Sequence, residues 1–420
     1  MPTMVDIFAG AGGLSEGFIR AGFEPVAHVE MDEAACFTLK TRRAYHWLKK
    51  KQRLAEYYGY LKQEFTRSEL YAKVPGSVLN SVINAEISPQ TLGGIFEQID
   101  GLLNGRKLDL LIGGPPCQAY SLVGRSRDKN GMKGDRRNYL FTQYAEFLKR
   151  YSPKYFVFEN VVGLLSAKDE DGAKYFDIIM KGFNDLGYSV EFKILNASMC
   201  GVPQTRKRVI LVGYSGKSTG FYPTPNDSEL KDFSINDIFA DLPKIKQGNG
   251  AVFWKPPHVY SNETILLGLE ILTPGQRPPL TFHVARPNQK NDLEIYRRVV
   301  SSWNRCAARS DYNDLPYKLK KHNNRHSFTD RFKVVAGNVP TSHTVVAHIS
   351  KDGHYYIHPD ILQNRSLTPR EAARLQTFPD DYFFESVSEH PGRTAAYKQI
   401  GNAVPVLLAQ RIAERLLENW

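Results

Sequence analysis

Cys117, one of four cysteines, lies where a reactive thiol would be expected, just beyond a predicted strand. It follows the apolar run Leu108 to Ile112, which is typical of a buried parallel strand, and the connecting residues are Gly113-Gly114-Pro115-Pro116. Glycines let the backbone approach a ligand and prolines stiffen the turn, so the sulfur would be held in one place. Free cysteines are most often small buried hydrophobes. Taken alone, Cys117 is open to that interpretation and to a nucleophilic role.

A glycine-rich turn near the N-terminus predicts a nucleoside site. Residues Met4 to Phe8 predict a strand, Ala9 to Gly13 a tight turn and Leu14 to Ala21 a helix. A dinucleotide fingerprint would need glycine where the chain has Ser15, so the pattern favours a cofactor without a pyrophosphate. The next predicted strand ends at Glu30, whose carboxylate suits the two hydroxyls of a ribose at the carboxyl edge of a parallel sheet.

Polar residues also flank two later apolar runs. Glu159 follows the predicted strand Tyr155 to Phe158, where its carboxyl group could donate a proton, and helix capping is the alternative. Arg206 and Arg208 precede the predicted strand Val209 to Val212 and alternate onto one face. Guanidinium groups in this arrangement could hold a carboxylate and a polar substrate, and a solvated sheet edge is the alternative.

The elements that must position these residues follow a regular rhythm. Strand and helix patterns alternate from Met4 to about Gly213, which predicts a doubly wound, mostly parallel α/β sheet with helices on both faces. After Tyr214 regular periods are few and Pro, Asn, Gly, Tyr and Trp are frequent, so we expect a second, smaller, loop-rich domain. An amphipathic helix is predicted from Ala403 to about Glu418.

Two basic segments stand out from the rest of the chain. Lys40 to Lys73 has ten Lys or Arg against three acids, with several aromatic residues, and is longer than a simple crossover requires. It could be a DNA-contacting arm or an exposed helix pair. Lys318 to Lys333 has six Lys or Arg and one acid, interleaved with His, Asn and Phe. That mixture could contact phosphates and base edges, and a solvated face is the alternative.

Six sequence blocks follow one another along nearly the whole chain. They are Asp6 to Gly13, Pro115 to Gln118, Glu159 to Val161, Gln204 to Arg208, Arg365 to Pro379 and Gln399 to Pro405. In this order they resemble the cytosine-C5 DNA methyltransferases of prokaryotic restriction-modification systems. One block alone could be chance, but six in one order make the resemblance specific.

The resemblance implies methyl transfer from S-adenosyl-L-methionine to C5 of a cytosine flipped out of a specific duplex DNA sequence, through a covalent adduct of Cys117 at C6. Its fold would be that of S-adenosylmethionine-dependent methyltransferases, with residues 1–215 plus 397–420 as catalytic and cofactor-binding domain and residues 216–396 as target-recognition domain and hinge. Residues Ala119 to Arg137 resemble the family's mobile catalytic loop. The implied catalytic residues are Cys117, Glu159, Arg206 and Arg208. The implied cofactor contacts are Phe8, Gly10, Gly12, Glu30, Met31, Glu86, Ile87, Pro116, Leu140 and Asn402. The implied DNA contacts are Gln118, Ser121, Arg125, Arg127 and Arg325.

Three other functions compete with DNA methylation. An enzyme of the same fold could act on cytosine in RNA, the fold could serve as a catalytically silent DNA-binding protein, and the glycine turn could belong to a nucleotide-dependent oxidoreductase. The retained Cys117, Glu159 and Arg206 argue against the second, and Ser15 in place of a third glycine argues against the last.

Composition agrees with a nucleic-acid partner. The 420 residues carry 55 Lys or Arg against 44 acids, a net charge of +11 that suits a phosphate-rich ligand. The spacing of the four cysteines predicts neither a metal site nor a disulfide framework. Neither a signal peptide nor a bilayer-spanning apolar stretch is predicted. Together with this composition, the resemblance implies a cytoplasmic, nucleoid-associated protein that is monomeric on double-stranded DNA, has no membrane partner, and acts separately from any cognate restriction endonuclease.

Overall fold

The computed structural model describes residues 1–116, 140–216, 220–223 and 233–420. Within these residues, seven strands form one sheet in the order β3-β2-β1-β4-β5-β7-β6. All neighbouring pairs from β3 to β5 are parallel, and β7 runs antiparallel to both β5 and β6. The prediction of a mostly parallel sheet is confirmed. The strands are β1 Thr3–Ile7, β2 Glu24–Glu30, β3 Val82–Asn84, β4 Leu110–Gly113, β5 Tyr155–Val161, β6 Ser189–Asn196 and β7 Lys207–Tyr214.

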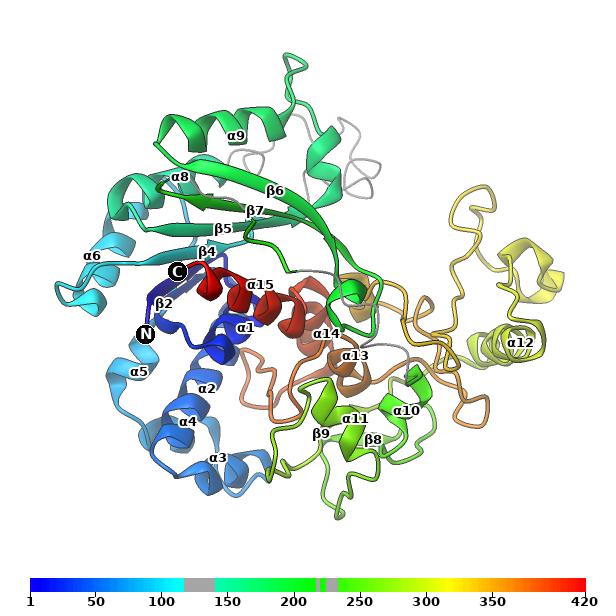
Figure 1. Ribbon diagram of the computed structural model, residues 1–420. Helices are drawn as coiled ribbons and strands as arrows, with labels where there is room; N and C mark the ends of the chain where they lie inside the picture. The colour runs from blue at the N-terminus through cyan, green and yellow to red at the C-terminus, as the bar shows by residue number, and fades with distance from the viewer. Residues whose placement is uncertain (117–139, 217–219, 224–232) are drawn as a thin grey trace.

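Helices cover both faces of this sheet, as Figure 1 shows. One core cluster joins alternate strand residues such as Val5 to α6 Leu92–Leu103, α8 Leu140–Tyr151 and α9 Tyr175–Asp185. The opposite cluster joins residues such as Met4 to α1 Gly13–Ala21 and to the C-terminal helix α15 Val406–Glu418. A Cβ atom at Gly17 of α1 would lie 2.6 Å from the carbonyl oxygen of Val406, so glycine permits the close packing of the two helices. The end of the chain therefore completes the core that the N-terminus begins.

The order of the strands reverses between β1 and β4, which is where open α/β sheets bind ligands. Ile7, the last residue of β1, pairs with Gly113, the last residue of β4, and Gly113 also pairs with Phe158 of β5. A Cβ atom at Gly113 would lie 2.4 Å from the carbonyl oxygen of Ile7, so the two strand ends are in very close contact. The residues that leave these three strands thus emerge at one edge of the sheet.

The basic insertion after β2 forms α2 Glu33–Lys50, α3 Leu54–Leu61, α4 Arg67–Ala72 and α5 Gly76–Asn80. Its aromatic residues are largely core, which neither alternative from the sequence anticipated. Tyr57 donates a hydrogen bond to the carbonyl oxygen of Asp381 at 2.7 Å, and Tyr60 donates one to the Glu385 carboxylate at 2.6 Å. Figure 1 shows α3 and α4 at the lower left, far from α12 at the right. The insertion is held against the segment around residues 381–385.

The region after β7 contains a two-stranded antiparallel sheet and several short helices. Its elements are β8 Gly250–Phe253, β9 Thr281–Val284, α10 Ile235–Phe239, α11 Glu263–Gly268, α12 Lys290–Cys306, α13 Pro369–Leu375 and α14 Arg393–Asn402. Much of this region shares a core cluster with α2–α4, so the domain expected at residues 216–396 does not have a core of its own throughout. A smaller cluster does join α12 to the loops around Tyr312 and Phe332. We call residues 290–334 the α12 lobe.

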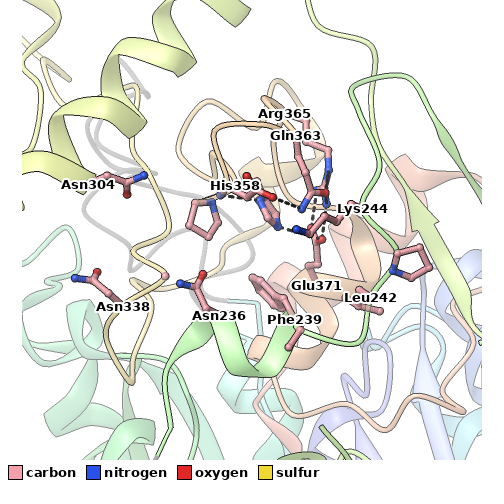
Figure 2. A pocket seen from close by; sticks show the side chains of 15 residues that line it. Asn236, Phe239, Leu242, Lys244, Asn304, Asn338, His358, Gln363, Arg365 and Glu371 are labelled. Atoms are coloured by element: carbon pink, nitrogen blue, oxygen red, sulfur yellow. Dashed lines mark hydrogen bonds and ion pairs between the residues drawn. The ribbon is translucent and has the colours of Figure 1, made fainter. Parts of the chain in front are cut away.

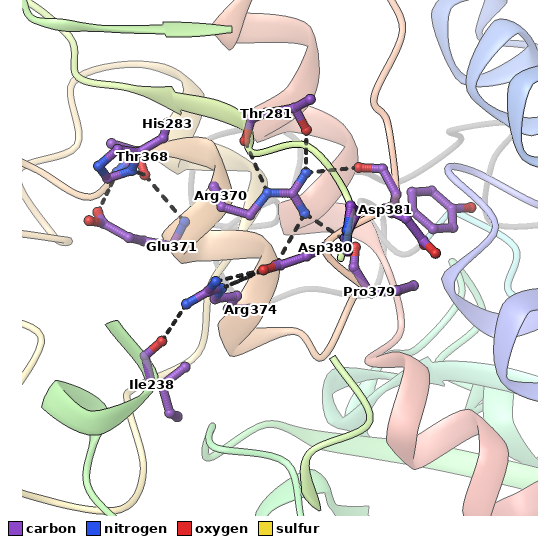
Figure 3. A network of polar contacts seen from close by, with 12 residues as sticks. Ile238, Thr281, His283, Thr368, Arg370, Glu371, Arg374, Pro379, Asp380 and Asp381 are labelled. Carbon is purple, nitrogen blue, oxygen red and sulfur yellow. Dashed lines mark hydrogen bonds and ion pairs between the residues drawn. The ribbon is translucent and has the colours of Figure 1, made fainter. Parts of the chain in front are cut away.

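Buried charges stabilise the helix α13, which belongs to one of the blocks singled out in the sequence. Arg370 donates hydrogen bonds to Thr281 and to the carbonyl oxygens of Pro379 and Tyr382 (Figure 3). Arg374 forms ion pairs with Asp380 at 2.6 Å and with Asp241 at 2.5 Å. Buried ions need such complete pairing, because desolvation would otherwise be costly. These arginines hold α10, β9 and α13 together.

Candidate active site at the carboxyl edge of the sheet

The backbone that leads to Cys117 is fixed by β5. Asn160, which is buried, donates a hydrogen bond from Nδ2 to the carbonyl oxygen of Pro115 at 3.3 Å. A Cβ atom at Gly114 would lie 2.6 Å from Oε2 of Glu159, so a side chain at this position would displace that carboxyl group. Cys117 itself lies outside the described residues. The site is therefore built from the two strands that bound this loop.

Glu159 and Arg208 form the charged pair of the site. Nε of Arg208 lies 2.7 Å from Oε1 of Glu159, and both side chains are largely buried. In the antiparallel register Glu159 pairs with Ile210 and Val161 with Arg208, so the two side chains are diagonal neighbours on one face. The guanidinium group therefore fixes the carboxyl group beside the end of β4.

The described partners of Arg206 are backbone carbonyl groups. Its guanidinium group is buried and donates to the carbonyl oxygens of Val345 at 2.6 Å and Gly401 at 3.3 Å. Gln204 accepts a hydrogen bond from the backbone N–H of Val345 at 2.9 Å. Arg206 thus connects β7 to the segment around Val345 and to α14, and Arg208 is the arginine that contacts Glu159.

The turn after β1 is held by Glu30. The carboxylate of Glu30 accepts hydrogen bonds from the backbone N–H groups of Gly10 at 2.7 Å, Met31 at 2.9 Å and Asp32 at 2.8 Å. Burial raises the pKa of Glu30, although these three N–H groups oppose the shift. Phe8 has a φ of 56° and Gly10 one of 54°, so the chain turns sharply where β1 ends. The predicted ribose carboxylate lies directly against the glycine turn.

The turn has the features of a cradle for a nucleoside. A Cβ atom at Gly10 would meet nothing within 4 Å, whereas one at Gly12 would lie 2.8 Å from Leu39 and 2.9 Å from the Tyr382 hydroxyl. Gly10 thus faces open space, whereas Gly12 packs against Leu39 and Tyr382. The carboxylate oxygens of Asp6 are buried, with the Ser15 hydroxyl as their neighbouring donor. Burial raises the pKa of Asp6 well above its usual range, the hydrogen bond from Ser15 opposes the shift, and the charge of Glu30 adds to it. These features fit a cofactor that brings its own hydrogen-bond donors.

The other predicted cofactor residues lie mostly along the same edge. Met31 follows β2 and is exposed, and Glu86 and Ile87 come shortly after β3, with Glu86 exposed and Ile87 buried. Three more residues belong to other segments. Pro116 comes shortly after β4, Leu140 begins α8 and Asn402 ends α14. The backbone after Asn402 approaches the turn, because a Cβ atom at Gly13 would lie 2.3 Å from the carbonyl oxygen of Val404.

The predicted DNA contacts divide into two groups. Arg325 lies in the α12 lobe, with its guanidinium carbon 5.7 Å from the centre of the Tyr317 ring. The remaining four lie outside the described residues and are Gln118, Ser121, Arg125 and Arg127.

The described cysteines differ from the reactive thiol that the sequence predicts at Cys117. Cys36 is buried beside Glu30, and burial raises the pKa of its thiol to about 12. Cys200 is also buried, and Cys306 is exposed at the end of α12. Thiols of high pKa are poor nucleophiles. In the described residues, no group of three or more His, Cys, Asp or Glu could hold a metal ion.

A polar cavity of about 480 Å³ lies away from the predicted site residues. Figure 2 shows Asn236, Asn304 and Asn338 around it, with His358 and Lys244 on the other side. His358 is buried, and burial together with Arg365 lowers its pKa to about 3. The cavity separates α10 from the end of α12.

Sequence reasoning missed three residues that shape the site. Asn160 and Gln204 stand inside blocks that were recognised, but their partners are distant in sequence. Tyr382 donates a hydrogen bond to the carbonyl oxygen of Ala11 and so supports the glycine turn from 371 residues away. Only the block pattern around Asn160 and Gln204 signalled their importance.

Comparisons with known proteins give a consistent result. The family model of C-5 cytosine-specific DNA methylases matches residues 2–57 and 89–418. The type II methyltransferase M.Bpa9945I of Bacillus paralicheniformis is 41% identical over 98% of this chain and 97% of its own. The type II methyltransferase M.DdeI of Desulfomicrobium norvegicum is 31% identical over 100% of this chain and 88% of its own. A candidate DNA modification methyltransferase from an E. coli prophage has the same fold, with a TM-score of 0.60 at 20% identity, covering 100% of this chain and 99% of that one. No helix in the described part of the chain is long and apolar enough to span a bilayer.

Proposed function

Since the chain belongs to the C-5 cytosine-specific DNA methylase family, we propose that it methylates C5 of a cytosine within a specific duplex DNA sequence as a type II modification enzyme. The observation that carries this proposal is the Glu159–Arg208 pair beside the backbone that leads to Cys117. The RNA alternative is not favoured, because the family is one of DNA methylases and both relatives are type II methyltransferases.

The thiolate of Cys117 adds to C6 of the cytosine ring, because C5 is too weak a nucleophile until electron density is pushed onto it. Negative charge then develops on the ring, and the Glu159 carboxylate, which takes up a proton as the base enters the site, passes that proton to N3. Arg208 holds the Glu159 carboxyl group in place. The target cytosine must leave the stacked duplex for this chemistry, at a cost of a few kcal/mol.

S-adenosylmethionine, when bound, would supply the methyl group that C5 takes up. Loss of the C5 proton to solvent then breaks the bond between C6 and the Cys117 sulfur, the thiolate leaves, and the N3 proton returns to Glu159. The turn from Phe8 to Gly13 would surround it, Glu30 would accept hydrogen bonds from the ribose hydroxyls, and Asp6 would accept one from a cationic or polar group of the cofactor. The switch point between β1 and β4 brings this turn next to the loop of Cys117, so the cofactor and the base can meet.

Arg206 acts as a positioning residue in this proposal. Its buried guanidinium group connects the start of β7 to Val345 and Gly401, so it orients the strand that carries Arg208.

The protein works on DNA as a monomer, in the cytoplasm, and a companion endonuclease acts separately on unmodified DNA.

The test is methyl transfer from S-adenosylmethionine with a labelled methyl group to unmethylated duplex DNA and, in parallel, to tRNA. We expect label in the duplex alone, and bisulfite sequencing of the product should place it at C5 of one cytosine in a fixed sequence. Label in tRNA alone, or at a nitrogen atom of the base, would contradict the proposal.

A further inference from the structure

The α12 lobe gives a rigid support to an exposed turn. Ile295 and Val299 of α12 pack in one small core with Tyr312 and Phe332, which bracket the segment between them. The side chain of Tyr312 is held in place. Its ring stacks on Phe332, and its hydroxyl accepts a hydrogen bond from the backbone N–H of His322 at 2.8 Å. The basic segment therefore leaves and re-enters a packed core.

Asn324 shapes the turn itself. Its Oδ1 accepts hydrogen bonds from the backbone N–H groups of His326 and Ser327, both at 3.1 Å, and its Nδ2 donates to the Ser327 hydroxyl at 2.7 Å. Phe328 follows with a φ of 55° and a side chain that is 50% exposed. A large aromatic residue in left-handed backbone is uncommon and costs conformational energy. The turn thus holds a phenyl ring toward solvent at an energetic cost.

Arg331 closes the turn. Its Nη2 donates to the carbonyl oxygens of Asn324 at 2.7 Å and Ser327 at 3.0 Å, and its Nε donates to that of Phe328 at 2.9 Å. Its guanidinium carbon lies 4.2 Å from the centre of the Tyr312 ring. The planar fork of arginine can make these contacts together, whereas the single ammonium group of lysine cannot. Nε and Nη2 of Arg331 therefore donate to the backbone of the turn itself.

Several side chains near the turn are exposed and available to contact DNA. Lys321 and His326 are exposed, and Tyr317 is 81% exposed with Arg325 above its ring. Cations, amides and aromatic rings of this kind contact phosphates and base edges. They surround the turn that Arg331 closes.

We propose that the turn Asn324–Phe328 reads bases in the target DNA, with Phe328 as its apolar contact, and that Arg331 positions this turn without contacting a phosphate. The inference rests on the proposed function. Apolar side chains can contact a thymine methyl group or enter between base steps, and either contact depends on an exact turn shape.

The test begins with the sequence that bisulfite sequencing assigns to the wild-type enzyme. Dissociation constants are then measured for that duplex and for duplexes with one altered base pair, at several KCl concentrations. Arg331→Lys keeps the charge and loses the fork, so we expect discrimination against an altered pair to fall at least tenfold while the slope of log Kd against log salt stays unchanged. The matched control Lys321→Ala should lower that slope by about 0.9 and keep discrimination.

Phe328→Gly provides the second variant, because it removes the side chain and glycine adopts the left-handed conformation without strain. We expect lost preference at one or two base pairs with an unchanged urea midpoint. A salt slope lowered by about one in Arg331→Lys, or full discrimination in either variant at wild-type stability, would overturn the inference. Absence of any DNA methylation by the wild-type enzyme would instead overturn the proposed function.

Discussion

At the scale of single residues, the chemistry depends on how closely the backbone of Gly114 passes the carboxyl group of Glu159. Gly114→Ala would place a Cβ atom 2.6 Å from Oε2, and this carboxyl group is already fixed by Arg208. We expect Glu159 to be displaced and the turnover rate to fall about 100-fold, since small misplacements of catalytic groups have effects of this size. Steady-state rates and the urea midpoint should be measured together. Wild-type turnover in a folded variant would show that Glu159 needs no such placement.

The thiol of Cys117 can be tested against another cysteine of the same chain. Cys117→Ser should retain S-adenosylmethionine binding and lose methyl transfer, because an alcohol has a far higher pKa than a thiol and cannot add to C6. Cys306→Ser is the matched control, since Cys306 is exposed at the end of α12 and should be dispensable. A duplex carrying 5-fluorocytosine at the target should trap the wild-type enzyme and the control covalently. Trapping of Cys117→Ser would contradict the proposed nucleophile.

At the scale of elements, the sequence predicted the strand ends well because each depends on a local apolar run. Glu30 and Glu159 were expected at strand ends, and both lie at the carboxyl edge of the sheet, Glu159 inside β5. The partners of Arg206 could not be predicted, because Val345 and Gly401 are more than 130 residues away. The helix α12 was missed although Ile295, Tyr296, Val299 and Val300 carry a helical period, since the surrounding composition favoured loops.

The packing of the insertion also could not be predicted from local sequence. A helix pair was one of the two alternatives from the sequence, but the burial of Tyr57 and Tyr60 depends on residues 381–385, more than 300 positions away. The family model also skips residues 58–88, so the latter half of the insertion is not part of the shared family pattern.

The position of the insertion leads to a prediction about its cations. Lys50 ends α2, Lys51 follows it, and both are exposed. Figure 1 shows the helices of the insertion far from the α12 lobe. We expect Lys50→Ala with Lys51→Ala to leave the slope of log Kd against log salt unchanged, because cations that contact no phosphate release no counterions. The measurement is duplex binding between 50 and about 200 mM salt. A slope lowered by one to two units would make the insertion a DNA-contacting arm.

At the scale of the whole molecule, reaction and recognition are expected from different parts of one chain. The strand ends hold Glu159, Arg208 and the glycine turn, while the α12 lobe has a small core of its own. Arg206 and Gln204 connect the sheet by buried hydrogen bonds to Val345, which follows the α12 lobe in the sequence.

The buried histidines make the stability of this molecule depend on pH. Burial, with the nearby charges of Arg43 and His46, lowers the pKa of His28 from 6.5 to about 3. In the unfolded chain the pKa is about 6.5, so as pH falls below this value the unfolded state takes up a proton that the folded state refuses. Stability is therefore lost between about pH 6.5 and pH 3. His283 and His358 shift in the same direction, whereas Asp6 and Glu385 shift oppositely.

His28→Gln isolates one of these contributions. The free energy of unfolding should be measured in urea at pH 7 and pH 5 for the wild type and the variant, because the opposing groups are common to both. We expect the wild type to lose about 2 kcal/mol more than the variant on going to pH 5, from the proton that unfolded His28 binds. This difference is independent of any constant cost of the substitution. An equal loss in both proteins would mean that His28 titrates alike in the folded and unfolded states, and its burial on β2 would then not exclude the proton.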